Sequence, residues 1–239
     1  MTISATPVRV EDILPWRDLY RQEMHRQIVH DNMHARTGWT QPYLIRIDDA
    51  PAGYGSILIG GPWTGTRTAF EFYLNPAHQS RAFDCFESFL AASQSNAIKA
   101  QTNDALLTVM LHQWGRDIMC EKIVFEDKLL TTSHRIDGAV LRRREAPDVD
   151  WVVEIDGTIA ANGGILYHYN RPYGDIYMEV AEPFRRRGVG TYLVQELKRI
   201  CYQLGSIPCA RCNPDNTASR QTLQRAGFVP CANILTGTI

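Results

Sequence analysis

The order of apolar and polar residues divides the chain into two runs of similar elements. Residues 9–35 form the first expected helix, because apolar side chains recur there at helical spacing and charged side chains fill the gaps. Short apolar stretches between turn residues predict strands, and longer periodic stretches predict helices. The rest of the first run comprises strands at 43–48, 53–59 and 69–74, a helix at 82–92, a strand at 98–102, a helix at 106–114 and a strand at 121–125.

The second run starts after residues 128–148, whose arginines Arg142, Arg143 and Arg144 and whose Pro147 suit a connector or an edge strand. Residues 228–239 have the pattern of a closing hairpin. Between them we expect strands at 151–155, 159–168 and 175–180, a helix at 191–202, a strand at 208–213 and a helix at 217–226.

An internal repeat explains this order. Setting Tyr43 against Trp151, an offset of 108 residues, aligns two hairpins without a gap. Any two hairpins share turn residues and aliphatic residues, but here the order of the elements repeats as well, which favours a duplicated fold. The identical positions are Ile47/Ile155, Asp48/Asp156, Ala52/Ala160, Gly55/Gly163, Ile57/Ile165 and Leu58/Leu166.

A glycine-containing loop follows the expected strand 175–180 and opens the helix 191–202. It reads Arg185-x-x-Gly188-x-Gly190, with Arg186 and Arg187 inside it. Glycines let a backbone approach an anion closely, and a helix N-terminus carries partial positive charge that the arginines would reinforce. The loop therefore predicts a phosphate site, the alternative being a basic turn that caps a helix. It fits neither the Walker loop nor the dinucleotide-binding loop.

A second polar segment joins the expected strand 208–213 to the helix 217–226. It runs from Asn213 through Asn216 to Ser219, and Asn is a favourable residue at a helix N-terminus. Alone, the segment is a capping turn. It follows the arginine-glycine loop by one helix and one strand, and two such motifs are much less expected to occur in this order by chance.

Together these motifs resemble the GNAT superfamily of N-acetyltransferases. The resemblance covers residues 151–231 and rests on the strand IYMEV, the loop RRRGVG, the helix TYLVQELKRI, the strand PCARCN and the segment NTASRQTLQRAGF. The chain resembles a tandem GNAT protein, with a degenerate GNAT-like domain at 1–127, whose loop at 76–81 lacks glycine, and an acetyl-CoA-binding catalytic domain at 128–239. The implied fold is α/β (α+β), each half being a twisted, mixed, mostly antiparallel sheet flanked by helices.

The resemblance implies direct transfer of an acetyl group from acetyl-CoA to a primary amine of a small molecule or an exposed amine, without a metal. The pyrophosphate would lie on the loop backbone and the pantetheine along the strand that ends at Val180. The implied cofactor-binding residues are Val180, Arg185, Arg186, Arg187, Gly188, Val189, Gly190, Thr191, Asn213, Asn216 and Ser219.

The catalytic groups are less clearly marked. Many members of the family have a tyrosine four residues before the glycine of the Gly-Phe pair, where this chain has Leu223. Asp175, Tyr177 and Glu179 share one side of their strand by alternation, and Glu179 is the candidate base. The missing tyrosine leaves two alternatives open: a module that binds CoA without transfer, and transfer of a different acyl group, including aminoacyl transfer from tRNA.

Composition narrows the functional class. The 239 residues carry a net charge of −1, which argues against a nucleic-acid binder that works by bulk electrostatics. No apolar run has the length of a membrane span and the N-terminus has no secretory pattern, so a cytoplasmic monomer or homodimer with reduced thiols is expected. The loops at 60–65 and 168–174 are aromatic candidates for acceptor binding.

Two possible metal sites are set aside. Cys209 and Cys212 point to opposite faces of an expected strand, so we expect core cysteines there. His30 and His34 lie one turn apart on an expected helix without a third ligand, and a solvated helix face is the simpler interpretation.

Overall fold

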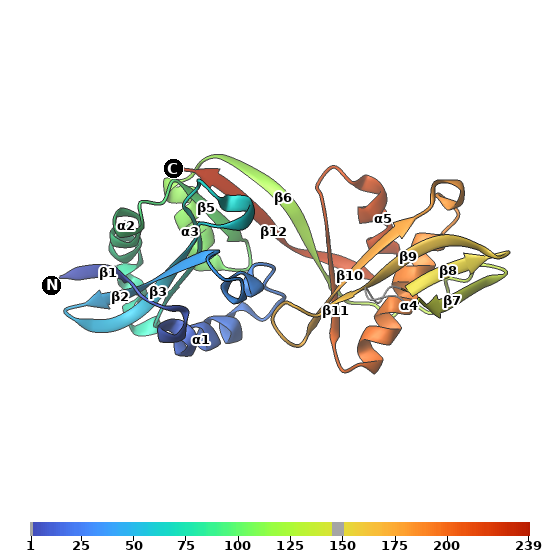
Figure 1. Ribbon diagram of the computed structural model, residues 1–239, viewed down its shortest axis with the longest axis horizontal. Helices are drawn as coiled ribbons and strands as arrows, with labels where there is room; N and C mark the ends of the chain where they lie inside the picture. Colours follow the sequence, from blue (N-terminus) through green and yellow to red (C-terminus); the bar gives the residue numbers. More distant parts are fainter. Residues whose placement is uncertain (1, 145–150) are drawn as a thin grey trace. The chain divides into compact units, whose positions relative to one another are not determined.

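The computed structural model describes residues 2–144 and 151–239, and these form two compact units (Figure 1). Unit 1 comprises Met1–Glu121 and Asn233–Ile239, and unit 2 comprises Lys122–Ala232. The predicted boundary at 127/128 differs from this division. Strand β6 (Arg116–Asp127) runs from unit 1 into unit 2, and β12 (Phe228–Thr238) returns the chain to unit 1. Pairing between segments distant in sequence, which no local pattern records, sets this division.

Unit 1 is a sheet in the order β1-β2-β3-β4-β5-β12, antiparallel except for the parallel pair β4/β5. Its strands are β1 (Ile3–Pro7), β2 (Thr40–Ile47), β3 (Ala50–Leu58), β4 (Thr68–Leu74), β5 (Ala97–Gln101) and the end of β12. Helices α2 (Ala82–Ser93) and α3 (Ala105–Trp114) share a core with Phe72 and Leu74 of β4. Helix α1 (Leu14–Met24) packs on Tyr73, which alternates with those residues and therefore faces the other way, and on its cross-strand partner Tyr54 of β3.

Unit 2 repeats the arrangement in the order β6-β11-β10-β9-β8-β7, with β10 and β11 as the parallel pair. Its strands after β6 are β7 (Ala139–Arg143), β8 (Trp151–Ile155), β9 (Thr158–Leu166), β10 (Tyr173–Val180) and β11 (Ile207–Cys212). Helices α4 (Val189–Gln203) and α5 (Thr217–Arg225) share one core with Ile176 and Met178. The predicted fold class is thus confirmed in both units.

Most predicted elements lie within a few residues of the observed ones, with three differences. The predicted hairpin at 228–239 is wrong, because β12 is one continuous strand that pairs with β5 across Ile234–Thr238. The predicted helix 9–35 ends at Met24, because His25 takes a left-handed conformation (φ 49°). Strand β1 was not expected. The predicted connector 128–148 contains edge strand β7, and its residues 145–150 lie outside the described residues.

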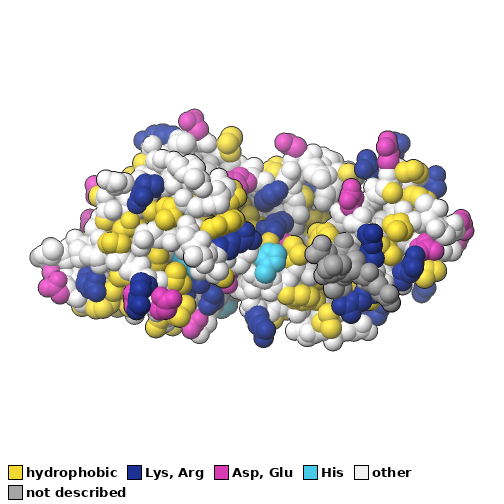
Figure 2. Space-filling model, in the orientation of Figure 1, with side chains coloured by type: hydrophobic (Ala, Val, Ile, Leu, Met, Phe, Trp, Pro, Cys, Tyr) yellow, Lys and Arg dark blue, Asp and Glu magenta, His cyan; other side chains and the backbone are white. Residues whose placement is uncertain are grey.

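Short 3₁₀ helices complete the fold: Val10–Ile13, Asp31–Ala35, Gly61–Trp63, Pro76–Arg81 and Glu182–Phe184. Figure 2 shows charged side chains of both signs spread over the visible face, in keeping with a net charge of −1. None of the described helices has the length and apolar character that crossing a membrane requires.

Candidate functional site

The site in unit 2 begins where two parallel strands separate. Strands β10 and β11 are paired from Tyr173/Ile207 to Ile176/Ala210 and no further. Beyond Ile176, β10 stays paired with β9 as far as Val180, so its other edge faces an opening between the strands. An edge of this kind offers backbone N–H and C=O groups to an extended ligand.

The loop before α4 shapes one wall of this opening. Gly188 is the N-cap of α4 and has φ +82°, a conformation that side chains rarely adopt. A Cβ on Gly190 would lie 3.2 Å from Val180 Cγ2 and 3.3 Å from Thr222 Cγ2, so glycine lets α4 start close against both β10 and α5. The first-turn N–H groups of α4 are the donors that an anion would meet.

Asn216 shapes the opposite wall. Its Oδ1 accepts a hydrogen bond from the N–H of Ser219 at 3.0 Å and caps α5. The two walls enclose a cavity of about 670 Å³. We call it the cofactor cleft, and it is lined by Met178, Glu179, Val180, Phe184, Arg185, Arg186, Gly188, Val189, Gly190, Thr191, Asn216, Ala218, Ser219, Thr222 and Arg225.

Most of the predicted cofactor-binding residues meet in this cleft, but two do not. Arg187 lies over the ring of Phe184, its guanidinium carbon 5.8 Å from the ring centre, and is outside the lining. Asn213 is also outside, and its side-chain oxygen accepts a hydrogen bond from Lys122 Nζ. The sequence reasoning missed Arg225, although it lies two turns after Ala218 on one face of α5, a spacing that helical periodicity could have found.

A smaller cavity of about 170 Å³ lies at the separation of the strands. We call it the split pocket, and it is lined by Leu166, Asp175, Ile176, Tyr177, Met178, Arg211, Ser219 and Leu223. Met178 and Ser219 border both cavities, so the cofactor cleft and the split pocket meet there. Leu223, which replaces the usual tyrosine, is buried at 2% exposure and offers no proton.

Glu179 borders the cofactor cleft and is exposed. Asp175 and Tyr177 precede it on the same face of β10, opposite the core face of Ile176 and Met178. The tip of Tyr177 lies over Gly164 of β9, where a Cβ would come within 2.8 Å of its hydroxyl. In unit 1, α1 covers the corresponding face, whereas α4 and α5 of unit 2 both pack on the other side.

Unit 1 has a related cavity with the opposite charge. Strands β4 and β5 pair only from Thr68 to Ala69, and a cavity of about 420 Å³ lies near the start of α3. Its charged lining residues are Glu23 and Asp104, where the cofactor cleft has arginines. The loop at 76–81 contains no glycine, and the side chain of Asn75 already accepts the N–H of Ala77.

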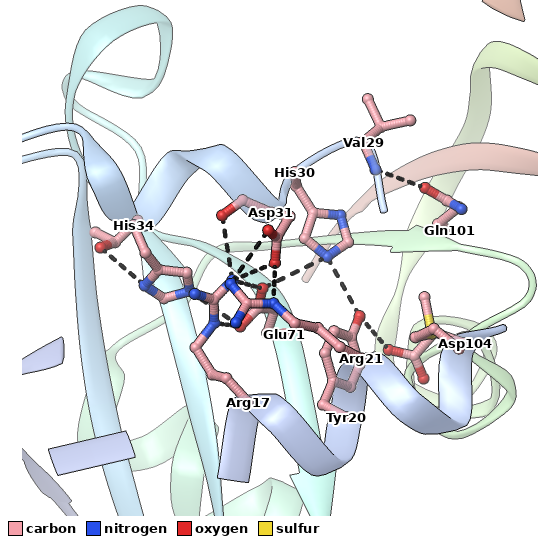
Figure 3. Close-up of polar contacts among 12 residues, drawn as sticks. Arg17, Tyr20, Arg21, Val29, His30, Asp31, His34, Glu71, Gln101 and Asp104 are labelled. Carbon is pink, nitrogen blue, oxygen red and sulfur yellow. Dashed lines mark hydrogen bonds and ion pairs between the residues drawn. The ribbon is translucent and has the colours of Figure 1, made fainter. Parts of the chain in front are cut away.

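A buried polar network fills the space beside this cavity (Figure 3). Glu71 is at its centre and accepts hydrogen bonds from Arg17, from Tyr54 OH at 2.9 Å and from His34 Nε2 at 2.9 Å. The expectation of a solvated helix face at His30 and His34 is wrong. His34 bonds Glu71, and His30 is buried 3.3 Å from the hydroxyl of Tyr20.

The core cysteines lie where they were expected. Cys209 and Cys212 are both buried in β11, and the Cys209 thiol donates to the carbonyl of Gly174 at 3.2 Å. Burial raises the pKa of the Cys209 thiol well above its usual value. Among the described residues, no three His, Cys, Asp or Glu side chains come together as a metal site.

The comparisons with known proteins agree with this geometry. Residues 111–228 match the model of the Acetyltransferase (GNAT) family. No curated protein sequence matches the chain. Among solved structures, a GNAT-family acetyltransferase from Colwellia psychrerythraea has a TM-score of 0.74 at 12% identity, with 99% of both chains covered.

Two further structures share the fold over the whole chain. A tandem GNAT protein from the clavulanic acid biosynthesis pathway has a TM-score of 0.66 at 13% identity, with 100% of this chain and 98% of that chain covered. A GCN5-related N-acetyltransferase from Sphaerobacter thermophilus has a TM-score of 0.63 at 12% identity, with 99% and 95% covered. Residues 111–228 thus match the Acetyltransferase (GNAT) family model, and the whole chain has the fold of the tandem GNAT structure.

Proposed function

We propose that the protein is an acetyl-CoA-dependent N-acetyltransferase whose reaction takes place in unit 2. The observation that carries this proposal is the cofactor cleft. It combines the edge of β10 beyond its pairing with β11, the N-terminus of α4 and three arginines in one cavity of about 670 Å³. These are the features that a long, extended, anionic thioester would require.

The residues present fit the two ends of acetyl-CoA. Arg185, Arg186 and Arg225 surround the helix N-terminus, where a pyrophosphate gains from full charges and from backbone donors. The edge of β10 beyond Ile176 would pair with the amide groups of pantetheine as an added strand does. Acetyl-CoA supplies an activated acetyl group, and the rest of the chemistry falls to the chain.

The chain's part in the transfer is orientation and proton removal. Backbone N–H groups of β10 beyond Ile176 would polarise the thioester carbonyl. Glu179 would accept a proton from the acceptor ammonium, directly or through water. The amine nitrogen then bonds to the carbonyl carbon and loses its second proton to solvent, the carbon–sulfur bond breaks, and the thiolate leaves with that electron pair. Because Leu223 has no hydroxyl, the thiolate takes its proton from solvent.

Leu223 also supports a second candidate function, a module that binds CoA without transfer. This alternative and the enzyme share the cofactor cleft and differ only in turnover. Release of CoA thiol in the presence of a chemically diverse panel of amines separates the two. Thiol release above the hydrolysis rate supports the enzyme, and none across the panel supports the binding module.

Calorimetric titration with acetyl-CoA tests the cleft itself. We expect one site per chain, because the cavity of unit 1 is lined by acids and its loop has no glycine. Gly188→Glu should weaken binding at least a hundredfold, since it places a carboxylate beside the pyrophosphate and a side chain at φ +82°. Gly205→Glu is the matched control, because Gly205 lies beyond the other end of α4 with φ +73° and open space around it.

The control distinguishes the effect of a side chain at positive φ from the effect of its position in the loop before α4. Gly205→Glu should bind acetyl-CoA as the unmodified protein does. Unimpaired binding by Gly188→Glu would show that the cofactor is not held at this loop, and two sites per chain would show that unit 1 binds it as well.

A further inference from the structure

Arg211 is a cation of unit 2 that does not line the cofactor cleft. Arg211 of β11 borders the split pocket, and its side chain is 24% exposed. It follows Ala210, the last residue of β11 that pairs with β10, so it lies where the strands begin to separate. A role for Arg211 toward the acceptor rests on the proposed function, because the acceptor belongs to that reaction.

Two groups hold the Arg211 guanidinium in place. Nη2 lies 3.1 Å from Oδ2 of the buried Asp175 and also donates to the hydroxyl of Tyr169. The Tyr169 ring packs against the guanidinium, with its centre 4.8 Å from the guanidinium carbon. Tyr169 belongs to the aromatic loop at 168–174, which is predicted from the sequence to contribute to acceptor binding.

These two contacts leave part of the guanidinium unused. Both polar contacts that the described residues make to Arg211 use Nη2. A guanidinium has five N–H donors, of which Nε and Nη1 carry three. A carboxylate that binds in a bidentate fashion needs Nη2 together with Nε, as Glu71 does on Arg17, or Nη2 together with Nη1. Because Nη2 of Arg211 is engaged, a carboxylate would accept from Nη1 alone. Asp175 and Tyr169 thus fix the orientation of a guanidinium whose Nη1 can still donate.

Arg211 lies near the place where the acceptor would meet the thioester. The split pocket meets the cofactor cleft at Met178 and Ser219, where a thioester lying along β10 would end. By strand alternation, Arg211 projects to the face of Asp175 and Glu179, opposite α4 and α5. This face therefore presents a guanidinium near the split and a carboxylate, Glu179, further along β10.

We propose that the acceptor is a primary amine that also carries a carboxylate, and that Arg211 binds this carboxylate through Nη1. Glu179 faces the ammonium end of the same molecule. Arg211 is thus a specificity-determining residue, and Asp175 and Tyr169 are positioning residues that act through it. The pocket volume of about 170 Å³ suits a small planar anion rather than a bulky one.

Matched amines test this assignment. The probes are glycine, β-alanine, 4-aminobutyrate and 6-aminohexanoate, each set against the alkylamine of the same chain length that lacks the carboxylate. With the unmodified protein, at least one amino acid of the series should exceed its alkylamine by roughly tenfold to a hundredfold in kcat/KM. The series varies the spacing between amine and carboxylate, which the side chains alone do not fix.

Two variants show whether Arg211 causes the preference. Arg211→Gln should remove it by raising KM for the amino acid, while kcat/KM for the alkylamine stays unchanged. Arg220→Gln, which changes an arginine of α5 outside both cavities, should keep the preference. The calorimetric affinity of Arg211→Gln for acetyl-CoA should match that of the unmodified protein, which shows that the variant is folded.

The outcomes separate this inference from the proposed function. Equal kcat/KM for amino acids and alkylamines, or a preference that survives in Arg211→Gln, overturns the role of Arg211 while leaving the transferase intact. If no amine is acetylated, calorimetry with the same amino acids still decides. Binding to the unmodified protein and not to Arg211→Gln supports the carboxylate site, and binding that is equal or absent in both overturns it.

Discussion

Replacing Glu71 with glutamine should destabilise unit 1 more than any surface substitution. Glu71 is fully buried and holds Arg17 through two hydrogen bonds of 3.2 Å (Figure 3). Burial alone would raise the pKa of its carboxyl, but the charge of Arg17 and the contact with His34 outweigh burial and hold that pKa well below the usual value. Glu71 is therefore an anion in the folded protein.

The size of the effect depends on the contacts that remain after the change. Glutamine keeps the shape but removes the charge, and it puts an N–H donor where Arg17, His34 and Tyr54 need an acceptor. Arg17 keeps Asp31, at 2.7 Å, as its other carboxylate. Breaking a buried ion pair in this way typically costs about 3–5 kcal/mol of unfolding free energy.

Urea unfolding monitored by tryptophan fluorescence measures this loss. With an m-value of about 2 kcal/mol/M, the transition of unit 1 should move down by roughly 2 M. Glu87→Gln is the matched control, because Glu87 is exposed on α2, and it should change stability by about 0.5 kcal/mol or less. A loss below about 1 kcal/mol for Glu71→Gln would refute the view that this carboxylate neutralises Arg17.

Two further predictions concern buried charges. Burial raises the pKa of Asp104 to about 7, so the folded state takes up a proton there as pH falls, and this contribution to stability is lost as pH rises through 7. The difference in unfolding free energy between the unmodified protein and Asp104→Asn should therefore rise by roughly 4 kcal/mol from pH 7 to pH 4. Urea titrations of both proteins at the two pH values measure this difference, and a constant difference would contradict the prediction. In unit 2, Lys198 is fully buried, with Nζ 2.7 Å from Asp127 Oδ1. Lys198→Met should cost about 3–5 kcal/mol in thermal or urea unfolding, against little for the exposed neighbour Arg199→Met, and equal effects would argue against a buried ion pair.

The pH dependence that His30 contributes to stability is opposite to that of Asp104. Burial lowers the pKa of His30 to about 4, so His30 removes stability as pH falls from 6.5 towards 4. Asp104 has the opposite effect in nearly the same range, and the hydroxyl of Tyr20 contacts both side chains. The two contributions offset each other in the unmodified protein, and Asp104→Asn exposes the contribution of His30.

Features that depend on neighbouring residues could be predicted from the amino-acid sequence. The loop around Gly188, the cap at Asn216 and most elements of both units could be predicted, because hydrophobic periodicity and capping act within about a dozen residues. These features were enough to indicate the fold and most of the cofactor cleft. Leu223 could also be located from the sequence, although its burial could not.

Contacts between residues far apart in the chain could not be predicted, because they depend on how the whole chain folds. His34 and Glu71 are 37 positions apart, Arg17 and Glu71 are 54 apart, and no local pattern distinguishes their burial from a solvated helix face. Strand β12 looked like a hairpin because its partner, β5, precedes it by more than a hundred residues. The role proposed for Arg211 also depends on the tertiary structure. The separation of β10 from β11 and the side chains of Asp175 and Tyr169 determine where its guanidinium lies. Strand pairing between distant segments is a property of the whole fold.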